Sequence, residues 1–258
     1  MSLQKDFIAA LSSRDIWLYF ACQDIRLRYR RSKVGPFWIT LSMVIFCLSL
    51  AVVYGQLFKA DIAEYLPFLS IGFVFWGLMS GILGEFPNVF IDNAAYIKDS
   101  KTNPFAILLR MMARHIIIFL HNSLIFIGIY LYFGINPGWN SLLVIPALFL
   151  VLLNLMAIGV SLSLFGLRFR DVPPIIQSMI QVLFFITPIT WFPKLLASDS
   201  WVMRANPFAY YLDLLRSPML GHEPHIMSWI VACGTLLVFS VIAVRIYNAK
   251  ASRIPFWV

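Results

Sequence analysis

The sequence predicts an all-α polytopic membrane protein, with six transmembrane helices, an N-terminal amphipathic interface helix, and short re-entrant helices between spans five and six. Of its 258 residues, 60% are apolar and 12% are charged, whereas about a quarter of the residues in a soluble domain carry a charge. Five cations lie between Arg26 and Lys33, and an uncharged run from Phe37 to Phe58 follows them. A basic cluster ahead of about twenty apolar residues is typical of a helix that enters a bilayer from the cytoplasm.

Residues 1–36 are expected to form a cytoplasmic segment built around an amphipathic helix from Asp6 to Arg31. One face of this helix holds Leu18, Cys22, Ile25 and Tyr29, and another holds Asp24, Arg28 and Arg31. Such a helix either anchors the chain at the bilayer surface or lies between that surface and a partner, and the sequence leaves both roles open. The segment lacks a short apolar core with a cleavage site, so we do not expect a signal peptide.

Residues 37–258 are expected to form the transmembrane domain. Its six apolar runs lie at about residues 37–58, 66–84, 115–133, 141–165, 175–192 and 226–246. Two further apolar patches, between Pro193 and Pro224, are too short to span and are expected to be re-entrant or interfacial helices. Glu85 is placed at an interface, because a carboxylate at mid-bilayer would cost about 2.5–3.5 kcal/mol. Asn93 to Lys98 predicts a short helix, ended by Asn103-Pro104.

The distribution of cations predicts the orientation of the chain. With six spans, 16 of the 20 lysines and arginines fall on the side of the termini and 4 on the other side. Because loops rich in Lys and Arg stay in the cytoplasm, both termini are expected there and the segment from Pro193 to Pro224 outside. The net charge of +8 is then mostly a topology signal, which makes nucleic acid an unexpected partner.

Motifs for catalysis, metal binding and nucleotide binding are missing from the sequence. It has no P-loop pattern, and its three cysteines form no C-x-x-C pair. The four histidines, His115, His121, His222 and His225, are expected to be packing or surface residues, since two histidines in a proline-broken loop are weak evidence for a metal. The runs 37–58, 141–165 and 175–192 carry no charge, which argues against an ion-coupled carrier.

Aromatic residues are the main feature of the spans. Trp38, Tyr54, Phe184 and Phe185 are candidates to line a path for a glycan, since aromatic rings stack on sugars; ordinary lipid-facing packing is the alternative. Gln177 and Gln181 share a face of span five and are expected to face protein or water. A transporter without ion coupling or its own nucleotide site needs a separate motor protein. Pro87–Arg114 and Arg168–Asp171 are the predicted cytoplasmic docking points for it.

Five short sequence motifs occur in order along the chain, each next to or between particular predicted spans. They are Gln23–Ser32 with Gly35 and Trp38, Asn93–Phe105, Arg168–Asp171, Thr187–Trp191, and Asn206-Pro207 with Arg216. Together, over nearly the whole chain, they resemble the transmembrane subunit of type-2 ABC exporters of polysaccharides, such as O-antigen and capsule exporters. The chain departs from that family where Asn103-Pro104-Phe105 reverses a Phe-Pro order, and where Phe169 replaces a tyrosine.

The resemblance implies a homodimer with two copies of a P-loop ATPase in a bacterial inner membrane, moving a lipid-linked polysaccharide, O-antigen first among the choices. ATP and Mg²⁺ would be bound by the ATPase, so no cofactor is expected in this chain, which is a permease rather than an enzyme. The implied sites are Arg26, Arg28, Arg30 and Arg31 at the substrate entrance, near the lipid diphosphate, and Tyr96, Ile97, Lys98, Arg170 and Asp171 at the ATPase interface.

Other functions stay open at this point. A teichoic-acid, capsule or drug exporter would use the same scaffold. A membrane-embedded enzyme acting on lipid carriers would need a carboxylate or histidine cluster near an interface, and the sequence has no obvious one. A passive membrane scaffold would show no ATP-dependent change with a partner.

Overall fold

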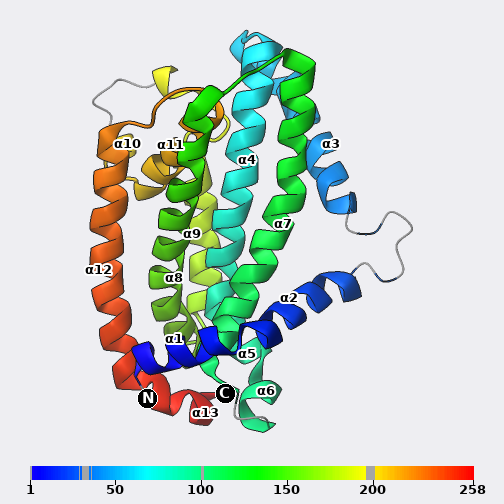
Figure 1. Cartoon of the computed structure of the whole chain (residues 1–258). Helices are drawn as coiled ribbons and strands as arrows, with labels where there is room; N and C mark the ends of the chain where they lie inside the picture. Colours follow the sequence, from blue (N-terminus) through cyan, green and yellow to red (C-terminus); the bar gives the residue numbers. More distant parts are fainter. Residues whose placement is uncertain (1, 29, 31–34, 36, 100–101, 196–200) are drawn as a thin grey trace.

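The computed structural model describes residues 2–28, 30, 35, 37–99, 102–195 and 201–258, and these residues form helices, turns and loops without a β-strand. Five helical segments of the described chain are long and apolar enough to cross a membrane. They comprise α3 (Phe37–Phe58), α4 (Ile62–Glu85, continued by short turns to Asp92), α7 (Pro104–Phe133), α8 (Val144–Arg168, preceded by the 3₁₀ turn η2, Gly138–Leu143) and α12 (Ile226–Lys250). They run side by side as an elongated bundle (Figure 1).

Helix α4 forms the centre of the bundle. Of the 18 consecutive residues in its apolar stretch, 83% are buried, whereas 17% are buried in the corresponding stretches of the segments that hold α3 and α12. It packs against α7 and α3 on one side and α11 and α9 on the other. The outer helices α3 and α12 therefore present most of their apolar surface outward, as helices surrounded by lipid or by another protein do.

Glycines allow the turn after α4 to lie directly on α8. This turn, η1 (Phe86–Asn88), contacts α8 closely. A Cβ at Gly166 would lie 2.0 Å from the carbonyl oxygen of Pro87, and one at Gly159 would lie 2.0 Å from the Phe86 ring. Side chains at these two positions would push the turn off α8.

The third span starts earlier than the sequence predicts. We expected Asn103-Pro104 to end the preceding helix and the span to begin near His115. The short helix α6 (Ala94–Asp99) is present, but α7 begins at Pro104. Asn103 caps α7, since its Oδ1 accepts a hydrogen bond of 2.9 Å from the Phe105 N–H. Proline is well suited to the first position of a helix, because the N–H it lacks would have no partner there.

The predicted fifth span is a shorter helix. Helix α9 (Val172–Ile186) has 15 residues, which reach about 22 Å at 1.5 Å per residue, less than the hydrocarbon core of about 30 Å. The helix stops because Thr187 is extended, with φ −95° and ψ 136°, and Pro188 follows it. The residues that the structure describes thus hold five candidate spans and one shorter apolar helix, and a sixth span stays a prediction.

The amino-terminal helix is divided, so the prediction of one helix from Asp6 to Arg31 is wrong. Helices α1 (Leu3–Ser12) and α2 (Arg14–Arg28) meet at Ser13, whose hydroxyl donates to the carbonyls of Ala9 (3.2 Å) and Ala10 (3.1 Å). Trp17 Nε1 donates to Ala10 O at 2.9 Å across the break. The two helices lie across one end of the bundle, where both chain termini are also found (Figure 1).

The predicted apolar face of α2 packs on the bundle only in part. Ile25 of that face is buried, together with Ala21 outside it, whereas Leu18 and Cys22 are exposed. Tyr29 lies outside the described residues. Small and branched side chains therefore make the contact with α7, because the two helices approach each other closely.

Helix α1 is fixed by hydrogen bonds to both α7 and α12. Asn103 Nδ2 donates to Asp6 O at 2.7 Å, and the Tyr247 hydroxyl donates to Asp6 Oδ2 at 3.1 Å. The Leu3 N–H donates to Asn248 Oδ1 at 2.8 Å. The beginning and the end of the described chain are thereby joined.

The described part of the predicted outer segment forms two short α-helices, at the end of the bundle away from the termini (Figure 1). They are α10 (Trp201–Arg204) and α11 (Pro207–Met219). Helix α11 is largely buried between α4, α8 and α12. The prediction of short helices in this segment is confirmed, while their re-entrant position in a membrane remains a prediction.

Candidate functional site

A network of five charged or titratable side chains joins three helices near the end that holds the termini. Arg110 makes a two-point contact with Asp24, with Nη2–Oδ1 2.6 Å and Nε–Oδ2 2.9 Å. Arg114 Nη1 lies 3.6 Å from Asp24 Oδ2, and its Nη2 donates to Glu85 Oε1. His115 Nε2 lies 2.8 Å from Glu85 Oε2. The network therefore links α2, α7 and the end of α4.

The partial burial of this network makes its contacts matter for stability. The side chains of Asp24, Arg110 and Arg114 are 17%, 19% and 21% exposed. Surface ion pairs contribute little, but a partly buried charge that loses its partner is left poorly solvated. The sequence placed Glu85 at an interface without naming a partner, and included Arg110 and Arg114 only within the predicted docking segment Pro87–Arg114. Their spacing of four residues on one helix face was the available signal.

Aromatic rings enclose Arg110. Its guanidinium carbon lies 5.2 Å from the centroid of Phe20 and 5.5 Å from that of Tyr96, within the range of cation–π attraction. A pocket of about 260 Å³ lies beside it between α2 and α7, lined among others by Trp17, Phe20, Tyr96, Ile107 and Arg110. An apolar cavity with a cation in its wall suits a ligand that carries both an apolar part and an anion.

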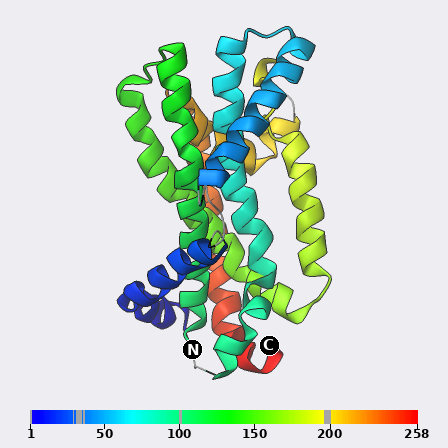
Figure 2. The same cartoon turned by 90° about the vertical axis from the view of Figure 1, so that its right-hand side faces the viewer.

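The predicted entrance arginines follow Asp24 along α2 and are not members of this network. Arg26 and Arg28 occupy the last turn of α2 and are exposed, as is Arg30. Arg31 lies outside the described residues. In Figure 2 the α1–α2 unit projects from one side of the bundle. The three described arginines are thus available to solvent or a lipid head group at the rim.

The four predicted channel aromatics differ in exposure. Trp38 is 51% exposed and Phe185 is 73% exposed. Tyr54 is half-buried and stacks on Phe58 with ring centroids 5.7 Å apart. Phe184 is half-buried against Phe73 (5.7 Å) and Trp76 (6.1 Å). The structure therefore separates Phe184, which packs in the bundle, from Phe185, which points away from it.

The residues predicted for the ATPase interface lie on the short helix α6 and at the bend between α8 and α9. Tyr96 and Lys98 are exposed on α6, while Ile97 between them is buried in the core. Arg170 and Asp171 are exposed at the bend between α8 and α9. Tyr96 also faces Arg110 of the network. Exposed side chains at both turns are consistent with a docking role, and Ile97 would act by fixing α6.

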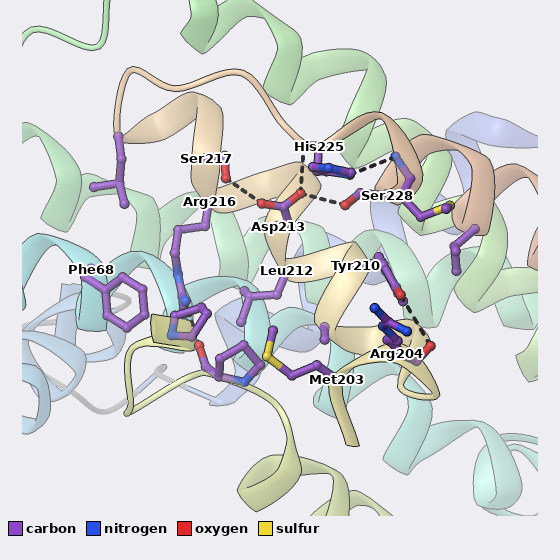
Figure 3. A pocket seen from close by; sticks show the side chains of 16 residues that line it. Phe68, Met203, Arg204, Tyr210, Leu212, Asp213, Arg216, Ser217, His225 and Ser228 are labelled. Atoms are coloured by element: carbon purple, nitrogen blue, oxygen red, sulfur yellow. Dashed lines mark hydrogen bonds between the residues drawn. The ribbon is translucent and has the colours of Figure 1, made fainter. Parts of the chain in front are cut away.

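A second polar cluster lines a cavity of about 930 Å³ at the opposite end, around α11 (Figure 3). The Asp213 carboxylate accepts hydrogen bonds from the hydroxyls of Ser217 and Ser228, both at 2.6 Å, and from the His225 N–H at 3.1 Å. His225 itself caps α12, because its Nδ1 accepts from the Met227 N–H at 3.2 Å. Asp213 thus fixes the start of α12 to α11.

Arg216 fastens α11 to the other side of this cavity. It is buried, it donates to the carbonyl of Pro188 at 2.6 Å, and its guanidinium carbon lies 3.8 Å from the Phe68 ring centroid. Burial lowers the pKa of Arg216 to about 9, a shift that the Asp213 carboxylate opposes, so the side chain is cationic at neutral pH. The sequence named Arg216 only as part of a motif.

Asn154 is a buried polar residue that the sequence reasoning missed. Its Oδ1 lies 3.0 Å from the Tyr211 hydroxyl and 2.9 Å from Thr235 Oγ1, and its Nδ2 donates to Ala232 O at 3.0 Å. Burial raises the pKa of Tyr211 to about 12, so this hydroxyl keeps its proton. The three helices α8, α11 and α12 are joined here. A lone amide within an apolar run was the signal.

Across the described chain, no group of three or more His, Cys, Asp or Glu side chains is placed to hold a metal ion. His115 belongs to the Glu85 network, and His121 Nδ1 contacts the carbonyl of Ile117 at 2.8 Å. The Glu85 and Asp213 carboxylates are each engaged with protein groups.

Comparison with known proteins extends over almost the whole chain. A family described as ABC-2 type transporter matches residues 17–220. Two proteins of Klebsiella pneumoniae, each named O-antigen export system permease protein RfbA, are 22% identical over 245 residues and 24% identical over 246 residues. In both cases the match covers 93% of this chain and 93% of the relative.

Proposed function

The chain belongs to the ABC-2 type transporter family, and on that premise we propose that it is the permease of an exporter that moves a lipid-linked polysaccharide, O-antigen first, across a bacterial inner membrane. The observation that carries this proposal is the match over 93% of both chains with two proteins named as O-antigen export permeases. The chain is a multi-pass membrane subunit and not an enzyme. ATP hydrolysis by a separate P-loop ATPase drives the transport.

A second copy of the chain completes the conduit in this proposal. Helix α9 has no buried residue, and only 17% of the residues in the 18-residue apolar stretch of α3 are buried. Apolar surface of this extent calls for lipid or a protein partner. A homodimer with two ATPase subunits would cover part of it. The exposed turns at Lys98 and Arg170-Asp171 would meet the ATPase, with both termini in the cytoplasm.

The proposed path begins at the rim formed by α2. Arg26, Arg28 and Arg30, together with Arg31, would receive the phosphate groups of the lipid carrier. Trp38, Tyr54 and Phe185 would offer ring surfaces to the sugars, and Phe184 would support them from behind. Replacing both Arg28 and Arg31 by alanine is expected to reduce export while leaving membrane insertion intact.

Reconstitution tests the proposed function directly. The chain and its ATPase are placed in proteoliposomes, and translocation of a labelled polyprenyl-diphosphate-linked glycan is followed with ATP, with a non-hydrolysable analogue, and with the chain alone. Transport only in the complete system with ATP is expected. Transport by the chain alone would overturn the proposal.

The same preparation separates the alternative cargoes. ATPase activity is measured with a lipid-linked O-antigen, a capsule glycan, a teichoic-acid precursor and an amphiphilic drug. Stimulation by the first is expected. Stimulation by the drug alone would assign the scaffold to a drug exporter instead.

A further inference from the structure

We propose that Arg110 and Arg114 form a binding site for the phosphate head group of an amphiphile, and that Asp24 occupies this site as an internal stand-in in the structure described here. The site lies between α2 and α7 and is separate from the predicted entrance arginines of α2. Its binding needs no ATPase and no polysaccharide, so it can fail while the proposed export function stands.

The first observation is the geometry of the two cations. Arg110 and Arg114 are one helical turn apart on α7, and both contact Asp24. Two like charges at this spacing repel each other unless anions lie between them. Guanidinium groups recognise carboxylates and phosphates through the same fork of N–H donors. Because a carboxylate binds between these two arginines, a phosphate group is expected to fit the same position.

Asp24 satisfies the two cations unequally. Its oxygens lie 2.6 and 2.9 Å from Arg110, but its nearest distance to Arg114 is 3.6 Å, beyond an ordinary hydrogen bond. A carboxylate has two oxygens, whereas a terminal phosphate presents three. A phosphate can thus keep the two-point contact with Arg110 and also reach Arg114, which favours it over the internal carboxylate.

The two carboxylates of the network differ in how they are held. Glu85 ends α4, the central helix, and also pairs with His115. Asp24 belongs to α2, which has only Ala21 and Ile25 buried. Asp24 reaches Arg110 by its side chain alone, so a change of its side-chain rotamer can release Arg110 while α2 keeps its place over the neighbouring pocket and Glu85 stays to orient Arg114.

The neighbouring pocket indicates the rest of the ligand. The cavity of about 260 Å³ has Arg110 in its wall, with Trp17, Phe20 and Ile107 among its apolar lining. It lies at the end of the bundle where α1 and α2 run across the helices (Figure 1). An anionic head group held by the arginines would place an attached apolar chain in this pocket. The ligand class is therefore a phosphate-bearing amphiphile.

Occupation by Asp24 lowers the apparent affinity for such a ligand. The measured dissociation constant is the intrinsic one divided by the fraction of molecules in which the site is free. Removing the Asp24 charge frees the site, so binding should tighten. Neutralising Arg110 or Arg114 removes the site, so binding should weaken. The opposite signs distinguish an occupied anion site from a purely structural ion pair.

The experiment uses the purified full chain in phosphatidylcholine nanodiscs, with polyprenyl diphosphate as the probe. Asp24→Asn, and Asp24→Ala as a second variant, should bind it about tenfold more tightly than the parent chain. Arg110→Gln and Arg114→Gln should bind it about tenfold more weakly. Asp15→Asn is the matched control, because Asp15 lies on the same helix, is 95% exposed and pairs with its neighbour Arg14 at 4.0 Å.

Further probes identify the source of the phosphate. Equal binding of inorganic diphosphate means that the head group alone is recognised, equal binding of phosphatidylglycerol points to a bilayer lipid, and preference for polyprenyl diphosphate points to a polyprenyl carrier. All three support the site. Equal binding of uncharged polyprenol, or Asp24 and Asp15 variants that behave alike, would overturn it.

A second measurement keeps Asp24 intact, so its outcome does not depend on whether the Asp24 variants fold. Cys22 is exposed on α2, two residues before Asp24, and Cys47 is buried. A spin label is attached to Cys22 after Cys233→Ser removes the other exposed thiol. Adding polyprenyl diphosphate should increase the mobility of the label, because Asp24 leaves Arg110. An unchanged spectrum at saturating probe would contradict the displacement.

Discussion

Asp24 and Arg110 stand 86 residues apart in the chain and form a two-point ion pair that holds α2 on α7. Asp24→Ala should therefore loosen α2, at a cost of about 1–3 kcal/mol, because a partly buried guanidinium loses its partner. Hydrogen exchange of residues 14–28 measures this, with Asp15→Ala as the control. Equal protection of the helix in both variants would show that the pair does not hold it.

The contact between η1 and α8 predicts an order among three glycine substitutions. Gly166→Ala would drive a Cβ into the Pro87 carbonyl, and Gly159→Ala would drive one into the Phe86 ring. Each should cost about 1–3 kcal/mol, visible as a lower melting temperature in detergent. A Cβ at Gly128 on α7 would have no neighbour within 4 Å beyond its own helical turns, so Gly128→Ala should be neutral or slightly stabilising. Three equal melting temperatures would contradict the close approach.

Phe184 and Phe185 are neighbours with different predicted effects. Phe184→Ala removes ring contacts with Phe73 and Trp76 and should lower stability by about 1–3 kcal/mol. Phe185 is 73% exposed, so Phe185→Ala should keep the melting temperature and reduce glycan export if its ring lines the path. Melting curves and the reconstituted transport assay separate the two. Normal export by Phe185→Ala would remove this residue from the proposed path.

The contact between Asn154 and Tyr211 is suited to a double-mutant cycle. Asn154→Ala removes the amide that joins α8 to Tyr211, Thr235 and the Ala232 carbonyl, and should cost about 1–3 kcal/mol although the Tyr211 hydroxyl keeps Thr235 Oγ1 at 2.7 Å. Tyr211→Phe should cost less, and the double variant should show a coupling of about 0.5–1.5 kcal/mol. Tyr210→Phe is the control, since its hydroxyl bonds the Arg204 carbonyl at 3.3 Å near the surface. Strictly additive losses would mean that the two side chains do not interact.

The spans could be predicted where apolar runs are bounded by polar residues. The expected first span coincides with α3, and the last begins at Ile226 as expected. The predicted start of the third span was wrong because a proline can either end a helix or begin one. Pro104 is a helix breaker after Asn103 but also a favourable first residue, and the cap from Asn103 decides for the second.

The sites were less predictable than the helices. Sequence periodicity on α2 placed Ile25 on the packed face but not Ala21, because that face is chosen by close packing and by the Asp24 pair. Nor could it pair residues as distant as Asn154 and Tyr211. The roles at Arg26, Arg28, Lys98 and Arg170 stay predictions, and the structure adds that all four are exposed.

The bonds from α1 to α12 impose an order on biogenesis. Asp6 waits for a partner 241 residues further along, and Leu3 for one 245 residues further along. At about 5–20 residues per second, a ribosome delivers those partners roughly ten to fifty seconds later. During that interval α1 has been synthesised, but its hydrogen-bond partners on α12 have not. A nascent chain stalled before Tyr247 should thus expose α1 to proteases that the finished protein resists.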